Sequence, residues 1–224
     1  MSRPPPPGNI KGMPAAFLDR RDAGRRLALL VSDLAGAGTV VLGLPRGGVP
    51  VAAEVADALG APLDVLVVGK IGVPGHEELA LAAVADDGRV ALNPGVIASA
   101  GLGADEVAEL ARRHAADLAR RAGELRAGRA PEPLAGRTVV VVDDGMATGA
   151  TMRVALDVVR RRDPQALVVA VPVAAPEAAA AAGEDADRVE CVLTPRDFRA
   201  VGPWYDDFTQ VSDREVRRLL ADQP

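Results

Sequence analysis

Cysteine and aromatic side chains are scarce in this 224-residue sequence. Cys191 is the single cysteine, so the chain can form no internal disulfide and no site built from several thiolates. Aromatic residues make up 2% of the chain and hydrophobic residues 49%, so the core must be packed mainly from Ala, Val and Leu. Cores of this kind suit buried parallel strands flanked by helices of small residues.

Three further absences narrow the class of function. No apolar stretch reaches the roughly 18 residues of a membrane span, and the first residues carry prolines where a signal peptide would have an apolar core. The net charge of −5 disfavours a nucleic-acid-binding surface. Neither a Gly-x-x-x-x-Gly-Lys-Ser/Thr loop nor a Gly-x-Gly-x-x-Gly loop follows the first predicted strand, which disfavours an ATPase or a dinucleotide oxidoreductase. We expect a cytoplasmic protein with no membrane or nucleic-acid partner.

Short β-branched runs alternate with stretches of helical periodicity along most of the chain. The predicted strands are residues 39–44, 63–68, 138–142, 167–173 and 189–193, and the predicted helices are residues 17–34, 49–59, 104–126, 148–162, 175–182 and 213–220. This alternation predicts an α/β fold with a mainly parallel sheet and helices on both faces. We expect one domain over residues 15–224, preceded by a flexible arm, residues 1–14, that is rich in Pro and Gly.

Residues 71–102 differ from the rest of the predicted domain. They are rich in Gly, Pro, Asp and Asn and hold only brief apolar runs, such as residues 79–84. A connection of this length inside a compact domain is usually functional or mobile. We expect a mobile loop here and assign no role to His76 within it.

Paired arginines recur along the predicted helices and the segments that flank them. The runs are Arg20-Arg21, Arg25-Arg26, Arg112-Arg113, Arg120-Arg121, Arg160 to Arg162 and Arg217-Arg218. Acidic residues nearby balance most of them, so we interpret them as solvated helix faces.

The most informative stretch runs from Val139 to Met152. Four consecutive valines, typical of a buried strand, precede Asp143 and Asp144, which stand where open α/β sheets place their ligands. A tight loop with two glycines and two threonines then leads into a predicted helix. Free N–H groups of such a loop, at the positive end of a helix, suit a phosphate group.

This pattern favours a site for ribose 5-phosphate. Carboxylates accept hydrogen bonds from vicinal sugar hydroxyls, and Thr148 and Thr151 add hydroxyl donors beside the phosphate. Each piece alone is bland, because Asp-Asp-Gly after a strand is often only a turn and Thr-Gly often only a helix entry. Their fixed spacing in one strand–loop–helix unit favours the functional interpretation. It requires both acids to face the loop and to escape unrelated ion pairs.

The segment resembles the phosphoribosyl diphosphate motif of type I phosphoribosyltransferases, and the likeness extends less sharply over residues 17–220. It implies the fold of that family, with a mobile loop over the active site and a C-terminal hood. Asp143 and Asp144 would then be catalytic residues that hold the ribose 2′- and 3′-hydroxyls. The implied 5′-phosphate-binding residues are Gly145, Met146, Ala147, Thr148, Gly149, Ala150 and Thr151.

A second loop, Pro45-Arg46-Gly47-Gly48, follows the first predicted strand. Its glycines expose N–H groups and Arg46 can grip phosphate oxygens, although a plain strand-to-helix turn has the same look. In similar transferases this loop binds pyrophosphate, which implies that role for Arg46, Gly47 and Gly48. Lys70 lies just beyond the next apolar strand, at the same edge of the sheet, and is a weaker candidate for the same diphosphate.

Residues 198–210 gather the only Trp, the only Tyr and two of the three Phe residues. These rings either pack a C-terminal cap onto a core short of large side chains or form a hood that stacks on a base. The second alternative follows the resemblance and makes Trp204, Tyr205 and Asp206 candidate base-binding residues within a hood over residues 194–212.

The resemblance implies transfer of ribose 5-phosphate from 5-phosphoribosyl 1-diphosphate to a nitrogenous base, with Mg²⁺ on the diphosphate, in a homo-oligomer such as a dimer. Family members that act on 6-oxopurines usually carry Asp where this chain has Ala147, which cannot move a proton, so a purine is only one candidate acceptor. A non-catalytic sensor of phosphoribosyl diphosphate or of a nucleotide is the alternative, and a hydrolase or synthetase of ribose phosphates is a third.

Overall fold

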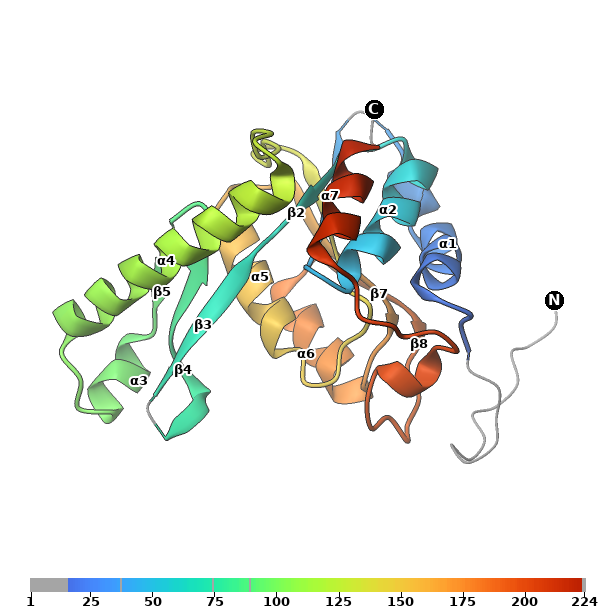
Figure 1. Cartoon of the computed structure of the whole chain (residues 1–224). Helices are drawn as coiled ribbons and strands as arrows, with labels where there is room; N and C mark the ends of the chain where they lie inside the picture. Colours follow the sequence, from blue (N-terminus) through green and yellow to red (C-terminus); the bar gives the residue numbers. More distant parts are fainter. Residues whose placement is uncertain (1–15, 37, 74, 89, 223–224) are drawn as a thin grey trace.

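A five-stranded parallel sheet forms the centre of the protein in its computed structural model (Figure 1). The structure describes residues 16–36, 38–73, 75–88 and 90–222, so the predicted arm, residues 1–14, lies outside the described residues. The strand order is β2-β1-β6-β7-β8, and every neighbouring pair is parallel. The strands are β1 (Thr39–Gly43), β2 (Leu63–Val65), β6 (Thr138–Val142), β7 (Ala166–Val173) and β8 (Arg188–Leu193). The predicted mainly parallel sheet is confirmed.

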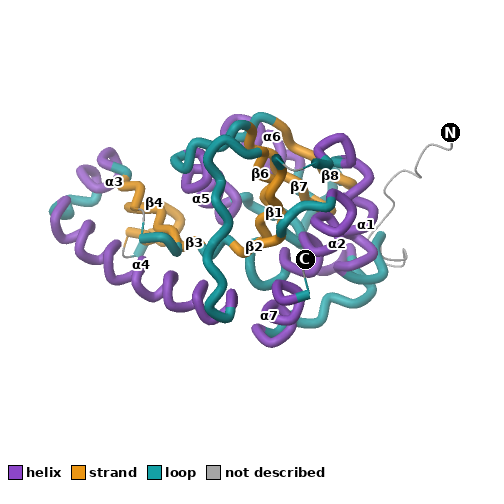
Figure 2. Tube along the Cα trace, turned by 90° about the horizontal axis from the view of Figure 1, so that it is seen from above, coloured by secondary structure: helices purple, strands orange, loops and turns teal. Residues whose placement is uncertain are grey.

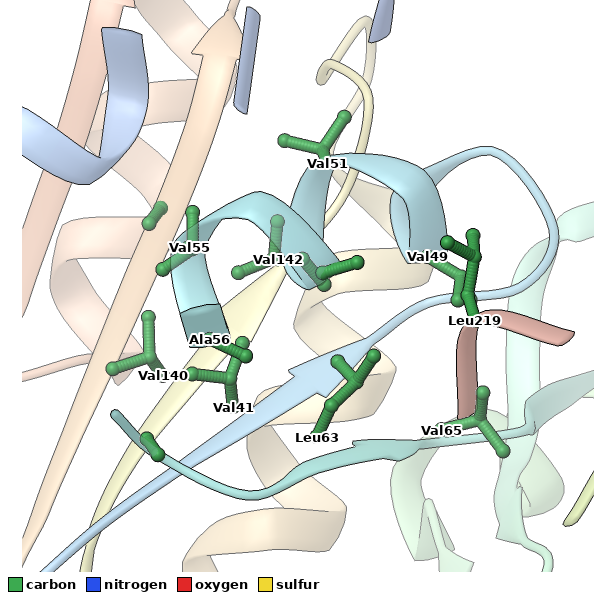
Figure 3. Packing of buried hydrophobic residues seen from close by; sticks show 14 of the residues in the cluster. Val41, Val49, Val51, Val55, Ala56, Leu63, Val65, Val140, Val142 and Leu219 are labelled. Carbon is green, nitrogen blue, oxygen red and sulfur yellow. The ribbon is translucent and has the colours of Figure 1, made fainter. Parts of the chain in front are cut away.

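Two apolar cores lie on the opposite faces of this sheet because successive side chains of a strand point to opposite sides. Val140 and Val142 belong to one core, whereas Val139 and Val141 belong to the other. Figure 3 shows the first core, in which Val41 and Val140 lie beside Val55 of the covering helix. With both faces buried, the central strands are continuous valine and leucine runs without polar alternation.

Helices cover both faces, as predicted. The first core contains side chains of α1 (Arg20–Leu30), α2 (Gly48–Leu59) and α7 (Asp213–Ala221). The second contains side chains of α5 (Ala150–Arg160) and α6 (Pro176–Asp185). Two short 3₁₀ turns complete this part of the chain, η1 (Ser32–Leu34) and η2 (Gly202–Trp204). No helix in the described part of the chain is long and apolar enough to cross a membrane.

Residues 68–126 form an insert between β2 and β6 that lies to one side of the five-stranded sheet in both views (Figure 1 and Figure 2). It holds a three-stranded antiparallel sheet of β3 (Val68–Val73), β4 (His76–Ala85) and β5 (Val90–Leu92), together with α3 (Pro94–Ser99) and α4 (Ala104–Arg126). Ile71, Leu81 and Val84 pack against Val107 and Ala111 of α4, which gives the insert a small core of its own.

The insert corrects two expectations. Residues 71–102 are not a plain connection with brief apolar runs, and the predicted strand over residues 63–68 is divided between two different sheets. The strands were missed because alanine fills many of their positions, as in Ala80 and Ala82 to Ala83, and alanine is a poor strand signal. The predicted movement of this segment over the site stays a prediction.

Buried charges join the base of the insert to the main domain. Arg126, at the end of α4, donates from Nε to Asp64 of β2 at 2.7 Å and lies 2.9 Å, through Nη2, from Asp86 at the end of β4. Arg162, after α5, contacts Asp86 and Asp87 at 3.3 and 3.0 Å. The run of arginines that contains Arg162 had suggested a solvated helix face, and for Arg162 this expectation is wrong. Burial raises the pKa of Asp86 although both arginines oppose the shift.

Candidate functional site

Two loops meet at the carboxyl edge of the sheet, one after β1 and one after β6. The parallel register pairs Gly43 with Val142, and the N–H of Leu44 donates to the carbonyl of Val142 at 2.9 Å. The loop of residues 45–48 and the loop of residues 143–149 therefore begin side by side. The structure thus brings together the two segments that the sequence singled out separately.

Both acids face the glycines of the neighbouring loop. A Cβ added to Gly47 would lie 2.0 Å from Oδ2 of Asp144, and one added to Gly48 would lie 3.1 Å from Oδ1 of Asp143 and 2.6 Å from the carbonyl of Val142. These distances leave no room for a side chain. Gly47 and Gly48 are therefore required for close approach to the acids, in addition to any contact that they make with a ligand.

The predicted phosphate loop is anchored through its main chain. The N–H of Met146 donates to Val173, and its carbonyl accepts from Ala175, both at 2.9 Å, so the loop continues alongside the end of β7. The side chain of Met146 is buried in the second core, and the other predicted phosphate residues lie at the surface or half-buried. Met146 therefore supports the loop from below.

The rest of the loop offers donors to a ligand. Among the described hydrogen bonds, none uses the N–H of Ala147, Thr148 or Gly149. The N-cap residue of α5, Gly149, has no side chain, and the N–H of Ala150 makes only a long bond of 3.4 Å to the hydroxyl of Thr148. Gly149 adopts φ +70°, a left-handed conformation that glycine adopts without strain. Unused N–H groups at the positive end of a helix form an anion site.

Arg20 of α1 binds one of the two acids, which the sequence did not indicate. Its Nε donates to Oδ2 of Asp144 at 2.9 Å, and its side chain is 10% exposed. Arg20 was expected on a solvated face, but it is the first residue of its helix and points inward. Asp143 forms no ion pair within the described part of the chain, and its Oδ1 accepts from the N–H of Asp144 at 2.8 Å. Each acid thus uses one oxygen within the site, Asp143 for a main-chain N–H and Asp144 for Arg20.

The electrostatics of the pair follow from burial. Burial and the charge of Asp144 hold the pKa of Asp143 well above its usual range. Burial also raises the pKa of Asp144, and the guanidinium of Arg20 opposes this shift. Arg20 offsets the repulsion between the two close carboxylates only in part, because the pKa of each acid stays raised, so a ligand that brings hydroxyl donors or positive charge gains binding energy here.

The sequence pattern of the phosphoribosyl transferase domain family matches residues 18–207, which include both loops and both acids. The chain belongs to this family. Two curated relatives from Mycobacterium tuberculosis, one each from strains CDC 1551 and H37Rv, are provisionally named phosphoribosyl transferases. Each is 50% identical to this chain over 204 residues, or 91% of this chain and 46% of the relative. The chain therefore spans about half the length of these curated relatives.

A solved structure shares most of the fold of this phosphoribosyl transferase domain. TT1426 from Thermus thermophilus is 45% identical, with a TM-score of 0.84 over 92% of this chain and 98% of that one. The part of this chain that is not matched is shorter than the insert, so most of the insert belongs to a shared architecture.

The predicted hood is anchored beside α1. The N–H of Phe17 donates to Trp204, and the N–H groups of Asp206 and Asp207 donate to Phe17 and Leu18. Tyr205 is 5% exposed, its ring centroid lies 5.3 Å from that of Phe17, and its hydroxyl donates to the carbonyl of Asp144 at 2.6 Å. Burial, then the charge of Asp144, raises the pKa of this hydroxyl.

These contacts separate the three candidate base-binding residues. Tyr205 packs in the core of the cap, as in the packing alternative that the sequence left open. Trp204 is half-buried and Asp206 is exposed, so these two stay predictions for contact with a base. The aromatic cluster therefore supports the acid pair through Tyr205, whatever its neighbours bind.

Arg46 and Lys70, the charged candidates for the diphosphate, differ in position. Arg46 lies in the loop beside the acids, half-buried, and Nη1 is 3.7 Å from Asp213 of α7. This distant and partly exposed contact leaves the guanidinium available. Lys70 does not lie just beyond a strand of the main sheet, because it is inside β3 of the insert, opposite Ala83. Its side chain is exposed there, and its contact with a diphosphate stays a prediction.

No group of three or more His, Cys, Asp or Glu residues in the described ranges could hold a metal ion. The two acids at the site alone do not make the oxygen cage of a protein-bound Mg²⁺. They do fit an Mg²⁺ that is held mainly by the oxygens of a bound diphosphate, because this ion commonly uses few protein ligands beside substrate phosphates.

Proposed function

We propose that this protein transfers ribose 5-phosphate from 5-phosphoribosyl 1-diphosphate to a nitrogenous base and releases pyrophosphate. The observation that carries the proposal is the juxtaposition of two acids, a glycine loop too close to carry side chains, and unused N–H groups at a helix start. Membership of the phosphoribosyl transferase domain family supports the same chemistry.

Each part of the site has one task in this proposal. Asp143 and Asp144 accept hydrogen bonds from the ribose hydroxyls, and the loop of residues 145–151 donates to the 5′-phosphate. Arg46 and the N–H groups of Gly47 and Gly48 bind the pyrophosphate, with Lys70 as a further candidate from the insert. Asp143 and Asp144 are the residues that would lie near an Mg²⁺ carried by the diphosphate, and such an ion would supply positive charge to the leaving group.

The reaction forms one bond and breaks one. A nitrogen lone pair of the base attacks C1′ while the bond from C1′ to the pyrophosphate oxygen breaks, with inversion at C1′. Positive charge that develops on the ribose ring is stabilised by the two carboxylates close by, and Arg46 stabilises the departing pyrophosphate. The insert would exclude water from this centre if it closes over it.

The acceptor is the open part of the proposal. A purine is one candidate, and Trp204 is the half-buried ring that could cover it. Ala147 is exposed and carries no proton acceptor, so a base that must lose a proton would give it to water or to another group. This feature argues against a 6-oxopurine acceptor and for a base that reacts without help at that position.

The deciding experiment measures pyrophosphate release from phosphoribosyl diphosphate and Mg²⁺ with a panel of purines, pyrimidines and other nitrogenous bases. At least one base should raise release above the rate without base. Asp144→Asn should lower that rate by about 10²–10³, since it removes a charge aimed at the developing cation. Binding of phosphoribosyl diphosphate by calorimetry should also disappear in this variant.

The absence of a proton acceptor at Ala147 favours one second candidate, a non-catalytic sensor of phosphoribosyl diphosphate or of a nucleotide. The same experiment separates the two. Tight binding of phosphoribosyl diphosphate with no release for any base would support the sensor. A wild-type protein that does not bind phosphoribosyl diphosphate would contradict both.

A further inference from the structure

Arg20 stands at the junction of the two acids and the C-terminal cap. Its Nε donates to Asp144 Oδ2 at 2.9 Å, and its Nη1 donates to the carbonyl of Thr209 at 2.9 Å. The guanidinium carbon lies 3.9 Å from the ring centroid of Phe208 and 6.0 Å from that of Tyr205. One side chain therefore touches the sugar-binding acid and the segment that would cover the acceptor.

The main chain makes this junction rigid. Residues 17 and 18 exchange hydrogen bonds with Trp204, Asp206 and Asp207, so the start of α1 and the cap form one unit (Figure 1). Tyr205, in the same cap, donates to the carbonyl of Asp144. Asp144 therefore accepts two hydrogen bonds from this unit, one at its carboxylate from Arg20 and one at its main-chain carbonyl from Tyr205.

The hydrogen bond from Arg20 leaves Oδ1 of the Asp144 carboxylate available to a ligand. Arg20 takes Oδ2, the oxygen nearest to Gly47, and no described hydrogen bond uses Oδ1 of Asp144. The guanidinium donates through Nε to Asp144 and through Nη1 to Thr209, so its planar donors hold the guanidinium itself in one orientation, which a single-point donor such as lysine would not do. The carboxylate therefore accepts from a donor of fixed position before any ligand binds.

We propose that Arg20 is a positioning residue that fixes the carboxylate of Asp144 for the ribose hydroxyls and links it to the cap. This proposal rests on the proposed function, since it assumes that a ribose phosphate occupies the site. Arg20 acts through Asp144 and does not touch the reacting atoms. A purely structural alternative is that Arg20 only holds α1 and the cap on the domain.

Two ligands distinguish these alternatives. Ribose 5-phosphate uses the acids and the phosphate loop, whereas inorganic phosphate uses the loop alone. Dissociation constants for both are measured by ligand-induced thermal shift on the full chain. The proteins are the wild type, Arg20→Met, Arg20→Lys and the control Arg25→Met, which removes an exposed arginine of the same helix that pairs with Asp22 and Glu54.

Arg20→Met should weaken ribose 5-phosphate binding by about 10–100-fold, as misplacement of a binding group typically does, and leave inorganic phosphate within about twofold. Arg20→Lys should recover part of the loss, because an ammonium restores charge but not the planar fork. Arg25→Met should match the wild type for both ligands.

Unchanged ribose 5-phosphate binding by Arg20→Met would overturn the proposal, and so would an equal loss of both ligands, which indicates general damage to the site. If Arg20→Met does not fold, Phe208→Leu tests the same junction, since Phe208 is 36% exposed and lies under the guanidinium. Loss of ribose 5-phosphate binding alone supports the proposal there, and no change overturns it. A wild-type protein that binds no ribose phosphate refutes the proposed function instead.

Discussion

At the scale of single residues, the site depends on two glycines whose lack of a side chain lets the loops approach each other closely. Gly47 has ordinary negative backbone angles, φ −64° and ψ −36°, so glycine is not there for its flexibility. It is there because Oδ2 of Asp144 occupies the space that a Cβ would take, 2.0 Å away. The same holds for Gly48 beside Val142. These contacts make the two loops one unit.

Gly47→Ala tests this directly. The added methyl must displace the carboxylate of Asp144 or the loop, so we expect a loss of about 1–3 kcal/mol in the free energy of unfolding, together with loss of phosphoribosyl diphosphate binding. Chemical denaturation and calorimetry measure the two effects. Gly38→Ala is the matched control, because an added Cβ there has nothing within 4 Å. An alanine at position 47 that binds as the wild type does would contradict the proposed geometry.

Asp143→Asn tests the cost of the acid pair to folding. Burial and the charge of Asp144 raise the pKa of Asp143 in the folded state. The folded protein therefore binds the proton more tightly than the unfolded chain, and stability falls as pH rises above the unfolded carboxyl pKa of about 3.9. The amide removes this term, so the variant should gain on the order of 1 kcal/mol at pH 7. The gain should vanish below about pH 3, and binding should be lost at any pH.

Urea denaturation from pH 3 to pH 8 checks that expectation. The matched control is Asp187→Asn, because the pKa of Asp187 is lowered by its hydrogen bond from Arg160. Asp187→Asn should change stability at neutral pH in the opposite direction, since a carboxyl group with a lowered pKa adds stability above the unfolded pKa and this stability is lost as pH falls. A pH profile for Asp143→Asn that parallels the wild type would show that Asp143 is not strained in the fold.

The sequence predicted the acids and the glycines of both loops, because their spacing after valine-rich strands is a local pattern. It could not predict Arg20 as the partner of Asp144, since residues 20 and 144 are 124 positions apart and the arginine pairs of this chain are, taken together, mostly exposed. A single charged residue at a helix start carries no local sign that it will point inward. Only the docking of α1 against the cap places it.

At the scale of elements, the insert shows where sequence patterns fail. The glycines at 75 and 88, on either side of β4, both adopt positive φ, +80° and +81°. Between them, β4 is rich in alanine and gives a poor β signal, and its burial depends on α4, which follows in the chain. The helix over residues 104–126 was predicted with its bounds because its apolar stripe spans many turns. Long helices with a periodic apolar stripe can be predicted from sequence, whereas alanine-rich strands that become buried only against such a helix cannot.

Arg126→Met tests what holds the insert on the main domain. The change leaves Asp64 and Asp86 buried without their shared cation, so the free energy of unfolding should fall by about 3–5 kcal/mol. Amide hydrogen exchange should rise in β3, β4 and β5 before it rises in the five-stranded sheet. Arg120→Met, on the exposed face of the same helix, loses a pair with Glu124 and should cost less than about 1 kcal/mol. Equal effects of the two variants would refute a special role for the buried cluster.

At the scale of the whole molecule, every assigned binding group lies within the matched family region, residues 18–207, although the chain spans about half of its curated relatives. The given chain should therefore bind phosphoribosyl diphosphate on its own. A ligand that binds only the folded state at 100 times its dissociation constant stabilises it by about 2.7 kcal/mol, which for a chain of this size raises the midpoint of thermal unfolding by roughly 5–10 °C. Asp144→Asn should abolish the rise.

If the insert closes over the ligand, amide exchange in β3 and β4 should slow as well, because the hairpin of the insert would then be held at the site. A rise in the unfolding midpoint without slower exchange there would support the binding site but contradict the predicted closure.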